Sequence, residues 1–242
     1  MAMYWNVPNV PCGGFRTINF PFDISQAPHK EGWYFAQQFN FLGQDSVGYT
    51  GLQPRPDDEN GQPVIHAAFS SFIDGTTQDD PNCWDTADGG PGVGCAVDFS
   101  APYDHSYHLE IVNTGGTTWT GTCVDDTTGN RIHVGTYTLP SGTQGIMGEQ
   151  WGFVEYYALE PKECPKVPYT SVTFGHPFTP TDTGSLGNPY ENPGAFCTGE
   201  QDFKFSRSTA GVRVEAGFKS LPQLHQPLDN VVNQYVIPFQ VV

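Results

Sequence analysis

The sequence predicts an all-β protein, a two-sheet antiparallel β-sandwich of the jelly-roll or concanavalin-like kind. Among its 242 residues are 28 Gly and 21 Pro, and only 15% are charged, a composition typical of many short strands joined by turns. Several segments alternate apolar and polar residues, as half-buried strands do. The chain shows no heptads, no internal repeat and no confident helix. About a dozen short strands in two packed sheets would account for all of this.

One all-β domain of this length is ordinary, so we expect a single sandwich over residues 1–242. Residues 1–14 are expected to form an N-terminal arm punctuated by Pro and Gly, and residues 161–242 the C-terminal strands and long loops that complete the sandwich. The first residues lack the basic and apolar regions of a signal peptide, so any such peptide is expected to have been removed. No apolar run approaches the ~18 residues that would span a membrane.

The clearest alternation lies at residues 32–42, which we expect to form a strand with one core face and one outer face. The expected core face carries Trp33, Phe35, Gln37, Phe39 and Phe41. The opposite face carries Tyr34, Ala36, Gln38 and Asn40, which suit the floor of a polar groove. The other expected strands are 15–24, 47–53, 64–74, 95–100, 106–113, 119–125, 131–139, 150–159, 171–174, 203–206, 212–218 and 231–242. Of these, 119–125 and 131–139 are expected to form a hairpin.

Charge excludes two classes of partner. Lys and Arg total 10 against 26 Asp and Glu, for a formal net charge of −16. Such a surface repels phosphate backbones and anionic lipid, so we expect no nucleic-acid partner and no membrane insertion. It suits a secreted protein that works in acidic surroundings.

The six cysteines include no C-x-x-C pair, which argues against a zinc or redox site. Their even number indicates disulfides and an oxidising, extracellular compartment. Cys83 and Cys95 flank one Gly-rich loop and are the predicted pair. The other four cysteines allow three pairings, and the sequence does not choose among them.

The segment from Asp74 to Asp98 is the longest stretch expected to be irregular, and it contains six aspartates. Hard cations prefer clustered oxygen ligands on loops, so the segment is a candidate calcium site. Its spacing does not fit an EF-hand, and aspartates also abound in plain turns. The candidate ligands are Asp74, Asp79, Asp80, Asp85 and Asp88. No other cofactor is indicated.

The expected strand at residues 150–159 carries an acid within a row of aromatic rings. One face presents Trp151, Phe153, Glu155 and Tyr157. If this face is half-exposed, it forms a floor suited to sugar or peptide. If it is buried, loss of water disfavours the ionised carboxylate and makes Glu155 a candidate acid or base. The structural alternative is a strand-end acid satisfied by a neighbour, with the rings packed as core.

Short segments of the sequence resemble two known protein families. The segments Y-T-G-L-Q (49–53), A-F-S-S-F-I-D (68–74), G-P-G-V-G-C (90–95) and G-F-V-E-Y-Y (152–157) resemble, in this order, a family of secreted bacterial and fungal domains of unknown function. That family is often found beside sugar-binding or sugar-cleaving modules. The resemblance covers residues 32–160 and implies a concanavalin-like sandwich with a link to carbohydrate.

The segments G-L-Q and F-V-E also resemble, more weakly, those of the fungal glutamic peptidases, with the hairpin segment 120–129 lying before the second. That resemblance implies that Gln53 and Glu155 are a catalytic pair. An ionised Glu155 would activate water as general base, and the Gln53 amide would stabilise the oxyanion. Pro54 directly follows Gln53, and the aromatic and glycine context of the family's Gln is not reproduced.

The sequence thus predicts a secreted protein that binds a glycan or polysaccharide on a concave face of aromatic rings and amides. The alternatives are an acid-acting hydrolase of glutamic-peptidase type, with a peptide substrate, and a polysaccharide-degrading enzyme. In either enzyme Glu155 would be the general base, with Gln53 as its catalytic partner in the peptidase. The expected binding residues are Tyr34, Gln38, Asn40, Trp151 and Tyr157. No serine-hydrolase or zinc-protease motif is present.

Overall fold

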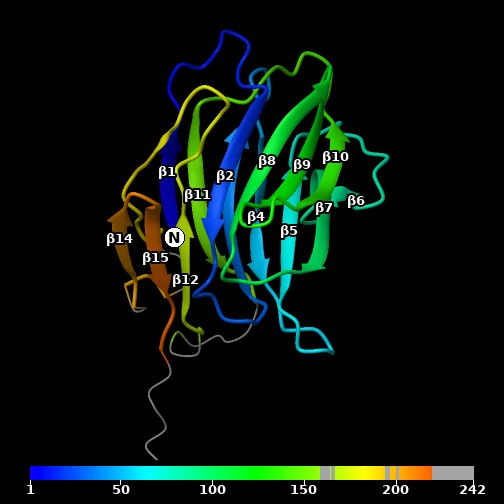
Figure 1. Ribbon diagram of the computed structural model, residues 1–242. Coiled ribbons are helices and arrows are strands. Elements are labelled where there is room, and N and C mark those ends of the chain that lie inside the picture. The colour runs from blue at the N-terminus through cyan, green and yellow to red at the C-terminus, as the bar shows by residue number, and fades with distance from the viewer. Residues whose placement is uncertain (159–163, 165–166, 194–196, 200–201, 220–242) are drawn as a thin grey trace, which may run out of the picture.

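The alternating segments of the chain form two antiparallel β-sheets that face each other across a hydrophobic core (Figure 1). The computed structural model describes residues 1–158, 164, 167–193, 197–199 and 202–219. The predicted all-β sandwich is confirmed. Among the described residues no helix has the length and apolar character needed to cross a membrane.

One sheet has eight strands. In spatial order they are β13 (Ser185–Leu186), β1 (Ala2–Asn6), β11 (Glu149–Tyr156), β3 (Trp33–Asn40), β4 (Val47–Pro54), β5 (Val64–Ser71), β7 (Gly90–Ser100) and β6 (Cys83–Ala87).

The other sheet has seven strands. In spatial order they are β10 (Arg131–Thr138), β9 (Thr118–Asp125), β8 (Ser106–Gly115), β2 (Thr17–Asp23), β12 (Thr170–Phe174), β15 (Gly211–Ala216) and β14 (Lys204–Ser208). The predicted hairpin is β9–β10, and hydroxyl pairs such as Thr120–Thr136, at 2.9 Å, join its strands. The expected strand at 231–242 lies outside the described residues.

Large aromatic side chains from both sheets fill the core. On β3, Phe35 and Phe39 are fully buried, as the alternation predicted. The Phe39 ring stacks near Phe69 of the same sheet, and Phe69 stacks on Tyr137 of β10 with ring centroids 4.4 Å apart. Burial of such a side chain stabilises the fold by about 1.5–3 kcal/mol. The inward faces are therefore committed to packing, and ligand contacts fall to the outward faces.

The N-terminal segment differs from the expected arm. Residues 2–6 form β1, which pairs with β11 on one side and β13 on the other. Met3 and Trp5 alternate inward and are fully buried. The alternation was present in the sequence, but its short length and the Pro and Gly that follow it concealed the strand.

The segment expected to be irregular also contains strands, because β6 and most of β7 lie within it. Cys83 and Cys95 face each other across these strands and form the predicted disulfide. A second disulfide joins Cys164 to Cys197, whereas Cys12 and Cys123 are free thiols.

Candidate functional site

The outward face of the eight-stranded sheet carries the polar and aromatic residues that the sequence singled out. On β11 the exposed side chains are Glu149, Trp151 and Glu155, with Phe153 half-buried between the last two. On β3 the same face presents Tyr34 and Gln38. The alternation of two adjacent strands thus brings the predicted residues onto one surface.

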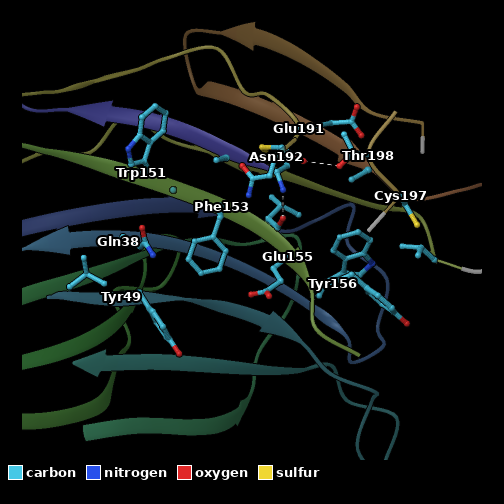
Figure 2. Close-up of a pocket in the computed structure, with 18 of the residues that line it drawn as sticks. Gln38, Tyr49, Trp151, Phe153, Glu155, Tyr156, Glu191, Asn192, Cys197 and Thr198 are labelled. Carbon is cyan, nitrogen blue, oxygen red and sulfur yellow. Dashed lines mark hydrogen bonds between the residues drawn. The ribbon is translucent and has the colours of Figure 1, made fainter. Parts of the chain in front are cut away.

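A groove with a volume of about 890 Å³ lies over this face (Figure 2). Its floor includes Gln38, Tyr49, Trp151, Phe153 and Glu155. One wall comes from the segment around Glu191 and from Thr198, on the long Gly- and Pro-rich loop that the Cys164–Cys197 disulfide anchors. The groove is large enough for several residues of an extended polymer.

Glu155 projects from β11 into the groove (Figure 2). Its side chain is exposed, so of the two alternatives that the sequence left open the structure shows the exposed face. Within the part of the chain that the structure describes, its carboxylate makes no side-chain hydrogen bond or ion pair. It is therefore accessible to a ligand or to water.

Gln53 and Glu155 lie in the same row across the sheet. Glu155 is opposite Tyr34 of β3, and continuing the β3–β4 register by one residue from the Phe35–Leu52 pair places Gln53 opposite Tyr34. The two backbones are therefore separated by two strand spacings, about 10 Å. No direct hydrogen bond joins the two side chains, so a ligand or water would have to lie between them.

Tyr34 is the residue that lies between them in the row. Its ring packs edge-on against Tyr49 and Phe153, each with a centroid distance of 5.5 Å. Only 5% of Tyr34 is exposed, and its hydroxyl has no hydrogen-bond partner among the described residues. Burial raises the pKa of Tyr34 well above its usual value, with smaller contributions from Tyr49 and from nearby carboxylates. Tyr34 is buried and does not line the groove, so its predicted ligand contact has no support from the geometry and stays a prediction.

Two other expected binding residues are engaged by neighbours. Asn40 accepts a hydrogen bond from the amide of Gln150. The hydroxyl of Tyr157 accepts one from Nη1 of Arg55 at 2.8 Å. Neither residue lines the groove, whereas Gln38 and Trp151 do.

The sequence did not identify every residue that lines the groove. Tyr49 lies on the same face as Gln53, and its hydroxyl donates to Asp88 at 2.6 Å. Burial, followed by this carboxylate, raises the pKa of Tyr49. The face-sharing alternation of residues 49–53 could have identified Tyr49. Glu191, Asn192 and Thr198 lie in loops. Loops lack the alternating pattern that predicts side-chain direction in a strand, so the sequence could not place these residues.

The five predicted calcium ligands are not brought together. Asp80 pairs with His133, which lies on the seven-stranded sheet, at 2.5 Å. Asp85 accepts a hydrogen bond from Gln78, and Asp88 accepts one from Tyr49. Across the described ranges, no three His, Cys, Asp or Glu side chains are grouped to hold a metal ion. Calcium binding by Asp74 and Asp79 together with these residues has no support from the geometry and stays a prediction of the sequence.

Comparison with known proteins gives the following. No protein-family model and no curated protein sequence matches the chain, so the resemblance to the secreted domain family has no independent support. Among solved structures, scytalido-glutamic peptidase with a transition-state analogue inhibitor has a TM-score of 0.43 and 13% identity, covering 89% of this chain and 98% of that one. SCP-B, an eqolisin-family peptidase in complex with the tripeptide Ala-Ile-His, has a TM-score of 0.39 and 11% identity over the same shares.

A third structure, the CBM2 module of the evolved Dit protein of Lactobacillus casei BL23 phage J-1, has a TM-score of 0.29 and 12% identity, covering 65% of this chain and 70% of that one. Similarity at these levels carries no inference about the activity of this chain. The structure itself is a two-sheet β-sandwich with an acidic groove, floored by aromatic rings, on the outer face of the larger sheet.

Proposed function

We propose that the protein is a hydrolase that binds an extended peptide in the groove and cleaves it with two residues: Glu155, which lines the groove, and Gln53, which lies two strands away in the same row and is not itself part of the lining. The observation that carries the proposal is the placement of these two side chains in one row on an open face, with only the strand of the buried Tyr34 between them. The proposed cleavage requires a peptide group and a water molecule to lie between the two side chains.

The chemistry needs only these two groups and water. The Glu155 carboxylate takes a proton from a water molecule as the water oxygen attacks the carbonyl carbon. The Gln53 amide donates a hydrogen bond to the oxygen that becomes negatively charged. The carbon–nitrogen bond then breaks, and the proton held by Glu155 moves to the departing amine. Phe153 and Tyr49 supply apolar surface for the side chains of the bound peptide.

The test is the substitution Glu155→Gln, assayed on an unfolded protein substrate between pH 3 and pH 6. A glutamine keeps the shape of the side chain but cannot accept the proton, so turnover should fall by about 10²–10⁴-fold. Glu149→Gln is the matched control, because Glu149 lies on the same strand and face but outside the groove. Full activity in Glu155→Gln, or no hydrolysis by the unmodified protein, would contradict the proposal.

Glycan binding is the second candidate function. It is favoured by an aromatic corner at one end of the groove, where Trp151 lies 5.3 Å from the Tyr4 ring and 5.7 Å from the Tyr190 ring. Trp151 and Tyr190 are each 41% exposed. The Tyr4 and Tyr190 rings are tilted 67° and 87°, respectively, to the Trp151 ring, so the three rings do not form a flat surface for successive sugar rings. This geometry is the reason that we place peptide hydrolysis first.

The glycan alternative is tested by Trp151→Ala on a glycan array and by calorimetry of any ligand found. Loss of one stacked ring should weaken binding by about 1–2 kcal/mol. Phe205→Ala is the control, since Phe205 is a similarly exposed ring on the other sheet. Equal effects of the two substitutions, or no bound glycan, would remove this candidate.

We further propose that the protein acts outside the cell. Two disulfides are formed in the fold, and such bonds persist in oxidising compartments.

A further inference from the structure

The row that contains Glu155 and Gln53 continues across two more strands. Gln53 of β4 is opposite His66 of β5, and His66 is opposite Asp98 of β7. Side chains directly opposite each other on neighbouring antiparallel strands have Cβ atoms about 4.5–5.5 Å apart. His66 is therefore the immediate neighbour of Gln53 on the side away from Glu155.

Asp98 fixes the orientation of the His66 ring. Nδ1 of His66 lies 2.7 Å from Oδ1 of Asp98. Because a carboxylate accepts, Nδ1 carries the proton in this contact, and the other ring nitrogen, Nε2, points away from β7. Nε2 of His66 and the side-chain amide of Gln53 are cross-strand neighbours, but within the described part of the chain they make no hydrogen bond to each other or to another residue. A rotation of the Gln53 side chain is needed to join them.

The surroundings of His66 contain one other charged group. Nε of Arg55, just beyond the end of β4, lies 3.8 Å from Oδ1 of Asp98. The remaining neighbours on this face are uncharged: Val64 and Ala68 on its own strand, Gly51 on β4, and Ala96 and Ser100 on β7. Burial lowers the pKa of His66 below its usual 6.5, and Arg55 adds to this, whereas Asp98 acts in the opposite direction.

We propose that Asp98 and His66 are a positioning pair that sets which end of the Gln53 amide faces the substrate. When Nε2 of His66 is protonated, it donates to the amide oxygen of Gln53, and the NH₂ group is directed toward the substrate carbonyl. When Nε2 is unprotonated, it accepts from the NH₂ group, and the amide turns its oxygen to the substrate. Only the first arrangement stabilises an oxyanion.

This inference rests on the proposed hydrolase function and adds a pH dependence to it. Hydrolysis should fall as pH rises through the pKa of His66, because the Gln53 amide then presents an acceptor in place of a donor. The decline should begin below pH 6.5, since the pKa of His66 is lowered. An enzyme relying on Glu155 alone for its pH dependence would lose activity only on the acid side.

The experiment measures kcat and KM against pH for the unmodified protein, His66→Gln and Asp98→Asn. In His66→Gln the decline of kcat with rising pH (the basic limb of the pH profile) should disappear. At the acid optimum kcat should fall about 10–100-fold, with KM little changed. In Asp98→Asn the basic limb should move to lower pH, because the carboxylate that stabilises the imidazolium is gone. The control is His108→Gln, which breaks a similar pair, with Asp126 at 2.7 Å, on the other sheet.

The outcomes separate the two proposals. An active protein whose basic limb is unchanged in both His66→Gln and Asp98→Asn would overturn the positioning role and leave the hydrolase function intact. Absence of hydrolysis at every pH would overturn both. If His66→Gln does not fold, the isosteric Asp98→Asn decides the question by the position of its basic limb.

Discussion

At the scale of single residues, Tyr34 shows how the groove floor is built. Its hydroxyl is buried without a partner among the described residues, and an unsatisfied buried hydroxyl destabilises the fold. We therefore expect Tyr34→Phe to raise the free energy of unfolding by about 1 kcal/mol, measured by denaturant titration. Tyr107→Phe is the contrasting variant and should lower the free energy of unfolding, because the Tyr107 hydroxyl donates to the carbonyl of Pro102 at 2.6 Å. Equal losses of stability in both variants would show that Tyr34 has a partner after all.

The sequence predicted the face of each β3 and β11 residue but not its accessibility. Period-two alternation determines only the side of the sheet on which a residue lies, so it predicts one outer face for Tyr34, Gln38 and Asn40. Whether a residue on that face is reachable depends on rings from neighbouring strands, such as Tyr49 and Phe153 over Tyr34. Those contacts join residues that are distant in sequence, and no local pattern contains them.

At the scale of elements, the β6–β7 hairpin connects the disulfide to the groove. Its tip carries Asp88, which holds Tyr49 on the groove floor. Thr86 and Asp88 have φ values of 96° and 48°, conformations that non-Gly residues rarely adopt. The strain is tolerated only while the hairpin is held in place, and the Cys83–Cys95 bond is one of its constraints.

We expect the double substitution Cys83→Ser, Cys95→Ser to lower stability by about 2–3 kcal/mol. It should also loosen the contact between Asp88 and Tyr49, so ligand affinity should fall with stability. Thermal unfolding with and without reductant measures the first effect. Cys12→Ser is the control, because Cys12 is an exposed free thiol. A double variant as stable as the control would show that strand pairing alone holds the hairpin.

Of the two disulfides, only the one within this hairpin could be predicted from the sequence. Cys83 and Cys95 are close along the chain, so a short loop brings them together. Cys164 and Cys197 are 33 residues apart with β12 and β13 between them, so no short loop brings them together.

At the scale of the whole molecule, carboxylates determine the response to acid. Burial acts to raise the pKa of Asp125, but hydrogen bonds from His105, Thr127 and Thr128 outweigh it and hold that pKa below its usual 3.8. The hydroxyl of Tyr169 lowers the pKa of Glu215 in the same way.

A lowered carboxyl pKa contributes stability that is fully present above the unfolded value and is lost as pH falls through the folded value. The melting temperature should therefore hold from neutral pH to about 4.5 and fall below about 4. Asp125→Asn should show a smaller loss between pH 5 and pH 3, measured by calorimetry. If the melting temperature of Asp125→Asn falls with pH in the same way as that of the unmodified protein, groups other than Asp125 cause the loss of stability in acid.

The position of β11 has a consequence for how the chain assembles. This strand lies between β1 and β3, although both of those precede it by more than a hundred residues. Until residues 149–156 have been synthesised, β1 and β3 have no shared partner, and each presents an unpaired edge of N–H and C=O groups. The strand that joins them also carries Glu155, so the nascent chain gains its candidate general base when β1 and β3 become connected. Fragments that end before residue 149 should therefore self-associate through their open edges.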